Sequence, residues 1–256
     1  MKKNINKRYH GFATRDYWIL QQIDWSNKKN KILEIGVSTG CVAEILETSE
    51  VEYCGIDISP PTIKYLNSFY DQNKRINFKE IDVTAESVLN NKYNNIISCD
   101  TLEHIEDSES FFQFIKKHLS DDGIAFVTFP NESEDNHHGV NWYTSFDSLH
   151  DEIKKAKLEV NQIFILENSK LHSFFERYLW ELPKKILSYR TKGANPQVFN
   201  ETKAYEINQN KGILFSLYYF YASFLTFIAC KFSIYNKKKL LKEIQNKRLF
   251  ILLKNE

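Results

Sequence analysis

The sequence is poor in the residues that mark a secreted, disulfide-stabilised protein. It has only four cysteines in 256 residues, Cys41, Cys54, Cys99 and Cys230, and none of them forms a CxxC pair. The first three fall in or beside apolar runs that are typical of buried strands or helix starts. We therefore expect reduced thiols rather than a disulfide framework.

The chain also lacks an excess of charge of one sign and a leader-like segment. Its formal net charge of +1 argues against a nucleic-acid binder, whose affinity comes from neutralising many phosphates. Residues 1–12 are basic and polar with no apolar region behind them, so we predict no signal peptide and expect a cytoplasmic protein. Acids and histidines do not occur at the spacing of a familiar zinc or iron motif, so we predict no metal site, with a magnesium-assisted reaction as the alternative.

What the sequence does contain is an alternation of short apolar runs and amphipathic stretches, which predicts strands and helices in turn. The predicted strands are 31–36, 52–58, 76–82, 94–100, 123–130, 157–167 and 248–256, and the predicted helices are 40–48, 60–70, 84–91, 109–119 and 143–157. This order is typical of right-handed βαβ units. We expect an α/β fold with a doubly wound, mostly parallel seven-stranded sheet.

Glycines and acids cluster where the predicted strands end. Gly36 and Gly40 bracket the turn between the first strand and the first helix, where a backbone without side chains lets a ligand approach. Asp57 ends the next strand, 21 residues after Gly36, and an acid there can accept both hydroxyls of a ribose. Asp82 and Asp100 end the third and fourth strands, so all of these groups belong to one edge of the sheet.

These motifs resemble the class I S-adenosylmethionine-dependent methyltransferases, over about residues 31–166 with the last strand returning near residue 248. The resemblance is carried by LEIGVSTG, CGIDIS, EIDVT and DTLEHIED. The last of these, with LSDDGIAFVTFPNE, is similar to the branch that contains ubiquinone-biosynthesis-type O-methyltransferases and bacterial glycan or lipid methyltransferases. The family's Gly-x-Gly-x-Gly loop has Ser38 in place of its middle glycine here.

The resemblance implies a fold of the Rossmann-like methyltransferase type and a bound S-adenosyl-L-methionine. It implies that Asp57 holds the ribose hydroxyls and that Asp82 accepts from the adenine amino group. The alternative for Asp57 and Asp82 is that they only cap the helices that follow. The side chains of Cys41 and Cys99 are expected to be small packing groups, with the backbone at Cys99 near the methionine end. The cofactor-binding residues implied by the resemblance are Glu34, Gly36, Ser38, Gly40, Asp57, Ile58, Asp82, Val83, Cys99 and Asp100.

Methyl transfer to a hydroxyl benefits from a base that removes the proton of the acceptor. The segment 130–149 follows the fifth strand, in the place where the family covers the acceptor, and it contains His137 and His138. We expect a histidine of this segment to be the base, and we favour His138 over His137. The alternative is that the segment is a polar surface loop whose histidines have no catalytic role. His104 is a third candidate, with the alternative that it pins its turn.

Two segments lie outside the repeat of strands and helices. Residues 1–30 are expected to form a lid in which Tyr9, His10 and Arg15 face the cofactor, or a simple packing helix. Residues 167–247 form a predicted helical insertion between the core at 31–166 and the last strand at 248–256.

The insertion contains an uncharged run at 212–230 followed by a strongly basic stretch. A single membrane crossing does not fit a chain that returns to the same sheet. The run is then a buried helix of a cap or of a homodimer interface, or it lies in a membrane interface. In the latter case the residues facing anionic lipid are Lys237, Lys238, Lys239, Lys242, Lys247 and Arg248.

The sequence thus favours S-adenosylmethionine-dependent O-methylation of a hydroxyl on a sugar of a bacterial surface glycan or of a lipid-linked acceptor. The alternatives are a methyltransferase of quinone-like or other small lipids, and a non-catalytic module that keeps the cofactor fold. A nicotinamide enzyme shares the glycine turn but fits Asp82 and the LEH turn less well. No Asn/Asp-Pro-Pro-Tyr/Phe stretch follows the fourth strand, which argues against amino-directed methylation of nucleic acid or protein.

Overall fold

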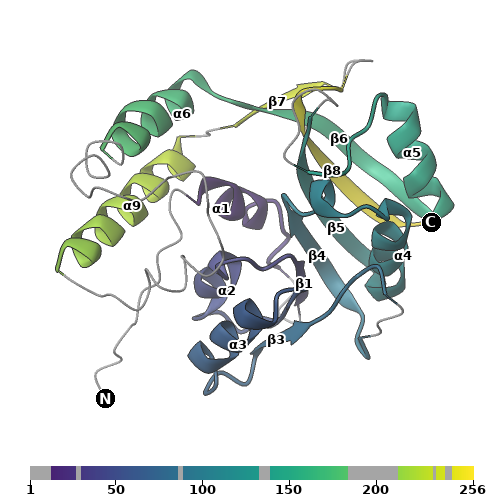
Figure 1. The fold of residues 1–256 in the computed structure, drawn as a ribbon, viewed down its shortest axis with the longest axis horizontal. Coiled ribbons are helices and arrows are strands. Elements are labelled where there is room, and N and C mark those ends of the chain that lie inside the picture. Colours follow the sequence, from purple (N-terminus) through teal and green to yellow (C-terminus); the bar gives the residue numbers. More distant parts are fainter. Residues whose placement is uncertain are drawn as a thin grey trace.

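A single sheet of eight strands, with helices on both of its faces, forms the centre of the protein (Figure 1). The fold is that of a computed structural model, which describes residues 13–26, 30–85, 89–132, 139–183, 213–232, 235–239 and 244–256. The strand order is β3-β2-β1-β4-β5-β8-β6-β7. The strands are β1 (Lys31–Ile35), β2 (Glu52–Asp57), β3 (Ile76–Glu80), β4 (Tyr93–Cys99), β5 (Leu119–Asn131), β6 (Leu158–Asn168), β7 (Tyr235–Lys239) and β8 (Lys247–Asn255).

The pairing of the strands confirms the predicted doubly wound, mostly parallel sheet. β3, β2, β1, β4 and β5 pair in parallel, whereas β8 runs antiparallel between β5 and β6. The sheet has one strand more than predicted, because β7 pairs antiparallel with β6 at the edge. β7 lies inside the insertion that the sequence predicted to be helical. Its sequence, YNKKK, lacks apolar alternation, and its lysines are typical of an edge strand.

The helices that cover the sheet are α1 (Thr14–Leu20), α2 (Cys41–Leu46), α3 (Pro60–Phe69), α4 (Ser108–His118) and α5 (Phe146–Lys155). Three of these five helices, α3, α4 and α5, begin at a residue whose side chain caps the helix. The Ser59 side chain accepts from the Thr62 N–H at the start of α3, and Pro60 occupies the first turn. Asp107 caps α4 in the same way through the Ser110 N–H. Helices α1, α2 and α3 cover one face of the sheet, and α4 and α5 cover the other (Figure 1).

The predicted helix over 84–91 is wrong at both of its ends. Residues 84 and 85 form a turn, residues 89 and 90 are not helical, and 86–88 lie outside the described residues. The Asp82 carboxylate accepts from both the N–H and the hydroxyl of Thr84, which stabilises a turn in place of a helix start. The Leu89 N–H donates to Nε2 of His118 at 3.0 Å, so this amide is also used outside any helix.

The core has two halves, one on each face of the sheet, because alternate residues of a strand point to opposite faces. In β8, Leu249, Ile251 and Leu253 pack with α4 and α5, whereas Phe250 packs with α1 through its contact with Trp18. The central strands are buried on both faces and so read as continuous apolar runs. This sandwich fixes the carboxyl ends of the parallel strands along one edge.

The described part of the insertion consists of two helical segments and β7. The first is α6 (Lys170–Phe174), which continues as a π-helix, η2 (Phe175–Glu181), and the second is α9 (Ile213–Lys231). α9 contacts α1 and η2, and Trp180 of η2 packs against Ala222 and Leu225 of α9. Within the described ranges, no helix meets the length and hydropathy of a candidate membrane span.

One buried amide ties the end of β5 to two later parts of the chain. Asn131 is 0% exposed, and its side chain donates to the carbonyls of Tyr143 and Ile244 and accepts from the Tyr143 N–H at 2.7 Å. We expect Asn131→Ala to lower the free energy of unfolding by about 2–4 kcal/mol, because it leaves buried backbone groups unpaired. Urea denaturation measures this change. The exposed Asn90→Ala is the matched control and should change stability by less than about 0.5 kcal/mol. Equal effects of the two substitutions would contradict the role of Asn131.

Candidate functional site

The loop that follows β1 is held in a strained conformation close to the loop that follows β4. Gly36, Ser38 and Gly40 all have positive φ angles, of 80°, 44° and 74°. A Cβ atom on Gly36 would overlap the side chain of Thr101, so only glycine fits there. The Thr101 hydroxyl donates to the carbonyl of Ile35 at 3.2 Å and fixes this close approach. The two loops therefore form one rigid wall.

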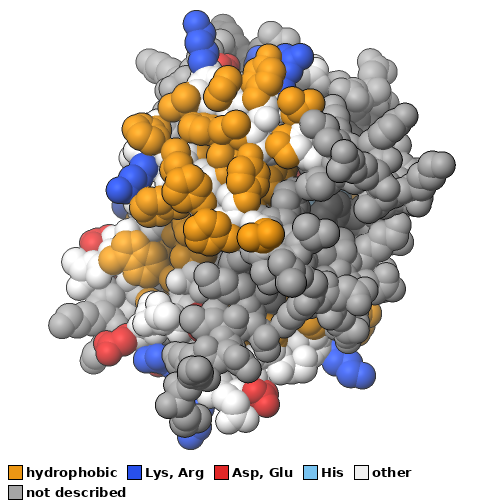
Figure 2. Space-filling view, turned by 90° about the vertical axis from the view of Figure 1, so that its left-hand side faces the viewer, with side chains coloured by type: hydrophobic (Ala, Val, Ile, Leu, Met, Phe, Trp, Pro, Cys, Tyr) orange, Lys and Arg blue, Asp and Glu red, His pale blue; other side chains and the backbone are white. Residues whose placement is uncertain are grey.

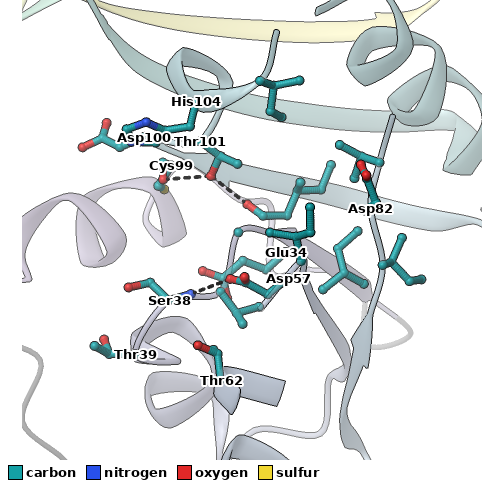
Figure 3. Close-up of a pocket in the computed structure, with 18 of the residues that line it drawn as sticks. Glu34, Ser38, Thr39, Asp57, Thr62, Asp82, Cys99, Asp100, Thr101 and His104 are labelled. Carbon is teal, nitrogen blue, oxygen red and sulfur yellow. Dashed lines mark hydrogen bonds between the residues drawn. The ribbon is translucent and has the colours of Figure 1, made fainter. Parts of the chain in front are cut away.

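Asp57, at the end of β2, binds the loop after β1 rather than capping α3. Its Oδ2 accepts from the Ser38 N–H at 3.2 Å, and its Oδ1 accepts from the Ser59 N–H at 3.0 Å. The cap of α3 is Ser59, so the capping alternative for Asp57 does not describe its contacts. The carboxylate is 9% exposed and lies next to Glu34 and Ser38 in the close-up view (Figure 3).

The carboxylates of Glu34 and Asp82 also accept hydrogen bonds from neighbouring protein groups. Glu34 is buried and accepts from the hydroxyl of Tyr53. Burial and the Glu34 carboxylate together raise the pKa of Tyr53 well above its ordinary value, so Tyr53 stays a donor. The Asp82 carboxylate accepts hydrogen bonds from Thr84 in a local turn. The alternative for Asp82 is that it caps a following helix; the bonds to Thr84 are of this local kind, but they stabilise a turn.

A single cavity brings most of the predicted residues together. Its volume is ≈ 1470 Å³, which exceeds the roughly 300–1,000 Å³ of common ligand pockets and leaves room for a second molecule beside a cofactor. Gly40 is the one predicted cofactor residue that does not line it. The predicted residues that line it are Glu34, Gly36, Ser38, Asp57, Ile58, Asp82, Val83, Cys99, Asp100 and His104.

The cysteines near the cavity are packing groups rather than reactive thiols. Cys41 and Cys99 both line the cavity and are not in disulfides. Burial raises the pKa of each thiol well above its ordinary value, so both remain protonated at neutral pH. Across the described part of the chain, no group of three or more His, Cys, Asp or Glu side chains is placed to hold a metal ion.

Asp100, after β4, is bound by two arginines from distant parts of the sequence. Arg15 of α1 and Arg248 of β8 both contact its carboxylate, and the backbone of Asp100 has a φ of 51°. The prediction that Arg248 faces lipid is wrong, because this side chain turns inward to Asp100. Arg15 lines the cavity, whereas Tyr9 and His10 lie outside the described residues, so the lid stays a prediction. α1 is also a packing helix, since Trp18 and Ile19 are buried.

Glu103, which the sequence did not single out, is a buried acid beside this cluster. It is 5% exposed, and its Oε2 has no hydrogen bond within the ranges that the structure covers. Burial raises its pKa to about 7, although Arg248 and Arg15 oppose the shift. Its backbone carbonyl accepts from the N–H groups of Val140 and Asn141. Glu103 is therefore in contact with the segment that follows β5.

Of the three candidate bases, the structure describes only His104. His104 lines the cavity with a largely exposed side chain, and its Nε2 lies 3.9 Å from Oε1 of Glu103. His137 and His138 lie outside the described residues. The signal for Glu103 in the sequence was its position beside His104 in the LEH turn.

The raised pKa of Glu103 has a consequence for stability. The folded state binds this proton more tightly than the unfolded state, so the free energy of unfolding falls as the pH rises from about 4.5 to about 7. In Glu103→Gln this loss, up to about 3 kcal/mol, should be absent. Chemical denaturation across this pH range measures it, with the exposed Glu109→Gln as the control. Superimposable pH profiles of wild type and Glu103→Gln would contradict the assignment.

Curated proteins similar to this chain include two O-methyltransferases. The chain is 24% identical over 107 residues to the ubiquinone biosynthesis O-methyltransferase of Rickettsia typhi, which covers 41% of this chain and 43% of that protein. It is 26% identical over 152 residues to the malonyl-[acyl-carrier protein] O-methyltransferase of Acetivibrio thermocellus, which covers 57% of this chain and 49% of that protein. The chain thus spans less than half the length of these relatives.

Solved structures of methyltransferases share the fold at low sequence identity. A putative sarcosine dimethylglycine methyltransferase from Galdieria sulphuraria superposes with a TM-score of 0.58 at 14% identity, covering 93% of this chain and 84% of that one. The Haemonchus contortus phosphoethanolamine N-methyltransferase 2 in complex with S-adenosyl-L-methionine gives a TM-score of 0.59 at 17% identity, covering 95% and 53%.

The family model described as a methyltransferase domain matches residues 10–177. This range contains α1, the strands from β1 to β6, and every predicted site residue of the cavity. The match covers well over half of the chain, which belongs to the family of methyltransferase domains.

Proposed function

We propose that this protein is an S-adenosylmethionine-dependent methyltransferase that methylates a hydroxyl on a sugar of a bacterial surface glycan or of a lipid-linked acceptor. The observation that carries the proposal is the cavity. Residues expected to bind the cofactor come from the ends of β1, β2 and β4 and from the turn after β3, yet they line one continuous space. The family match and the fold of the solved methyltransferases support the same class.

The groups that line the cavity fit the chemistry of S-adenosyl-L-methionine. Gly36 lines the cavity where the methionine moiety is expected, and its lack of a side chain lets Thr101 pack against the loop. Asp57 offers carboxylate oxygens to the ribose hydroxyls, and Ile58 and Val83 offer apolar surface to the adenine. Asp82 is the proposed partner of the adenine amino group. The carboxylates of Glu34 and Asp100 border the methionine end.

Bound S-adenosyl-L-methionine supplies a methyl group that is already activated on a sulfonium. The protein then has to align the acceptor and to take up the proton that its hydroxyl loses as the oxygen gains the methyl group. His138, His137 and His104 are the proposed bases, in that order. His104 borders the cavity, and the other two follow β5 in the segment anticipated to cover the acceptor.

The proposed acceptor is large or lipid-linked because of the insertion. α9 packs on α1, and Ala13, Arg15 and Asp16 at the start of α1 line the cavity. The insertion is therefore connected to the cavity through α1, and its exposed apolar side chains suit a lipid-linked molecule. The proposed location is the cytoplasm at the inner face of the membrane, with α9 as a region of membrane contact.

A second candidate function is O-methylation of a quinone-like lipid. The observation in its favour is the similarity to the ubiquinone biosynthesis O-methyltransferase of Rickettsia typhi. The two proposals differ in the acceptor and share the cofactor site.

Calorimetric titration with S-adenosyl-L-methionine and, separately, with NADH tests the cofactor assignment. We expect micromolar binding of the first and none of the second. Asp57→Ala should weaken binding by about tenfold to a hundredfold, because it removes charge-assisted hydrogen bonds to the ribose. The exposed Asp71→Ala is the matched control and should bind like wild type. Wild-type affinity of a folded Asp57→Ala protein would refute the ribose assignment.

Transfer of labelled methyl groups tests the acceptor class and the base. With methyl-labelled S-adenosyl-L-methionine and a total lipid extract of the producing cells, we expect label to enter the lipid phase. His138→Ala should lower the rate by about a hundredfold with little change in cofactor affinity. Label found only in water-soluble products would contradict a lipid-linked acceptor. An unchanged rate for His138→Ala would move the base to His137 or His104.

A further inference from the structure

Most of the exposed large apolar side chains belong to one side of the insertion. Nine of the thirteen in the described residues lie on α6, η2 and α9 or directly beside them, between 43% and 68% exposed. Figure 2 shows hydrophobic side chains gathered into one continuous area on this side of the molecule. We call this area the apolar face; its members are Leu171, Phe174, Tyr178, Leu182, Leu217, Phe220, Phe224, Phe227 and Phe232.

The apolar face belongs to helices that are firmly packed on their other side. In α9, Ala222, Leu225 and Ala229 are at most 3% exposed, and they pack on η2 and on the core around α1. Phe220 and Phe224, one turn apart, point outward with their rings stacked 6.4 Å apart. Helix α9 therefore has apolar side chains on both sides, but η2 and the core around α1 cover only one of them. An exposed apolar side of this kind is typical of a surface that binds a protein or a membrane.

The charges around the apolar face are mostly positive. Lys231 ends α9, and its Nζ lies 5.0 Å from the ring centre of Phe227; Arg177 lies over the ring of Tyr178 at 5.6 Å. Basic groups thus lie directly against the aromatic rings, and Figure 2 shows Lys and Arg at the border of the apolar area. Among the side chains that the structure describes, α6, η2 and α9 carry three Lys or Arg and two Glu, namely Lys170, Arg177, Lys231, Glu176 and Glu181.

This combination of groups fits one kind of partner better than a second copy of the chain. A two-fold dimer through the apolar face would bring the same basic border against itself, which costs electrostatic energy. An anionic bilayer offers apolar chains to the Phe and Leu side chains and negative headgroups to the basic border. Phe and Leu on one side of a helix with Lys and Arg at its border are typical of helices that lie in a membrane interface.

We propose that the apolar face docks the protein onto the surface of an anionic lipid bilayer, with α9 lying along the surface. The inference deepens the proposed function and rests on it in one respect, namely that the acceptor is lipid-linked. α1 connects the two sites, because its first turn lines the cavity and its other side packs on α9. Docking would thus hold the cavity at a fixed position above the lipid surface.

Flotation with lipid vesicles tests the docking surface without any acceptor. We expect wild type to float with vesicles of phosphatidylcholine and phosphatidylglycerol, much less with phosphatidylcholine alone, and less at high salt. The triple variant Phe220→Ser, Phe224→Ser, Phe227→Ser should lower the bound fraction by about tenfold or more. Trp25→Ser, which removes an exposed aromatic side chain outside the apolar face, is the matched control and should float like wild type. Lys231→Glu should weaken binding to the anionic vesicles only.

Two results would overturn the docking proposal. One is wild type that ignores the anionic vesicles. The other is a lipid-free dimer that the triple Ser variant dissociates, since a second copy would then cover the apolar face. Titration of the same proteins with S-adenosyl-L-methionine separates the proposals, because cofactor binding without flotation refutes only docking, and flotation without cofactor binding refutes only the methyltransferase assignment. Circular dichroism of each variant establishes that it is folded.

Discussion

The contact of Asp100 with Arg15 and Arg248 joins the parts of the chain on which the site depends. Asp100 follows the central strand β4, whereas the two arginines come from the first helix and the last strand. Two guanidinium groups repel one another, and the carboxylate of Asp100 offsets this repulsion by contacting both. Through Arg15 the contact places α1 at the cavity, and α1 in turn supports α9.

The strands and most cavity residues were predictable because their signals are local. A parallel strand that is buried on both faces reads as an apolar run, and the acid or glycine that ends it lies at the carboxyl edge whatever the rest of the chain does. Asp57 and Asp82 were therefore brought to one cavity as expected. Gly40 does not line the cavity, and its left-handed conformation precedes the start of α2.

The failures concern pairings between distant residues. β7 has no apolar period of its own and exists through pairing with β6, while Tyr235 at its start is buried and shares a hydrogen bond with Thr14. In the sequence, Arg248 is one of several basic residues in a lysine-rich stretch. Its contact with Asp100 depends on the antiparallel pairing of β8 with β5, which the sequence does not reveal. Burial raises the pKa of Glu103, and the burial of a side chain cannot be inferred from composition.

The place at which the insertion enters and leaves the sheet has its own consequence. β6, which precedes it, and β8, which follows it, are hydrogen-bonded neighbours, so both ends of the insertion leave from one side of the sheet. A segment anchored in this way can change in length and sequence without shifting the register of the strands, and each doubling of its length costs only about 0.6 kcal/mol of loop-closure entropy. A change of length within the insertion would thus leave the pairing of β1 to β4 as it is.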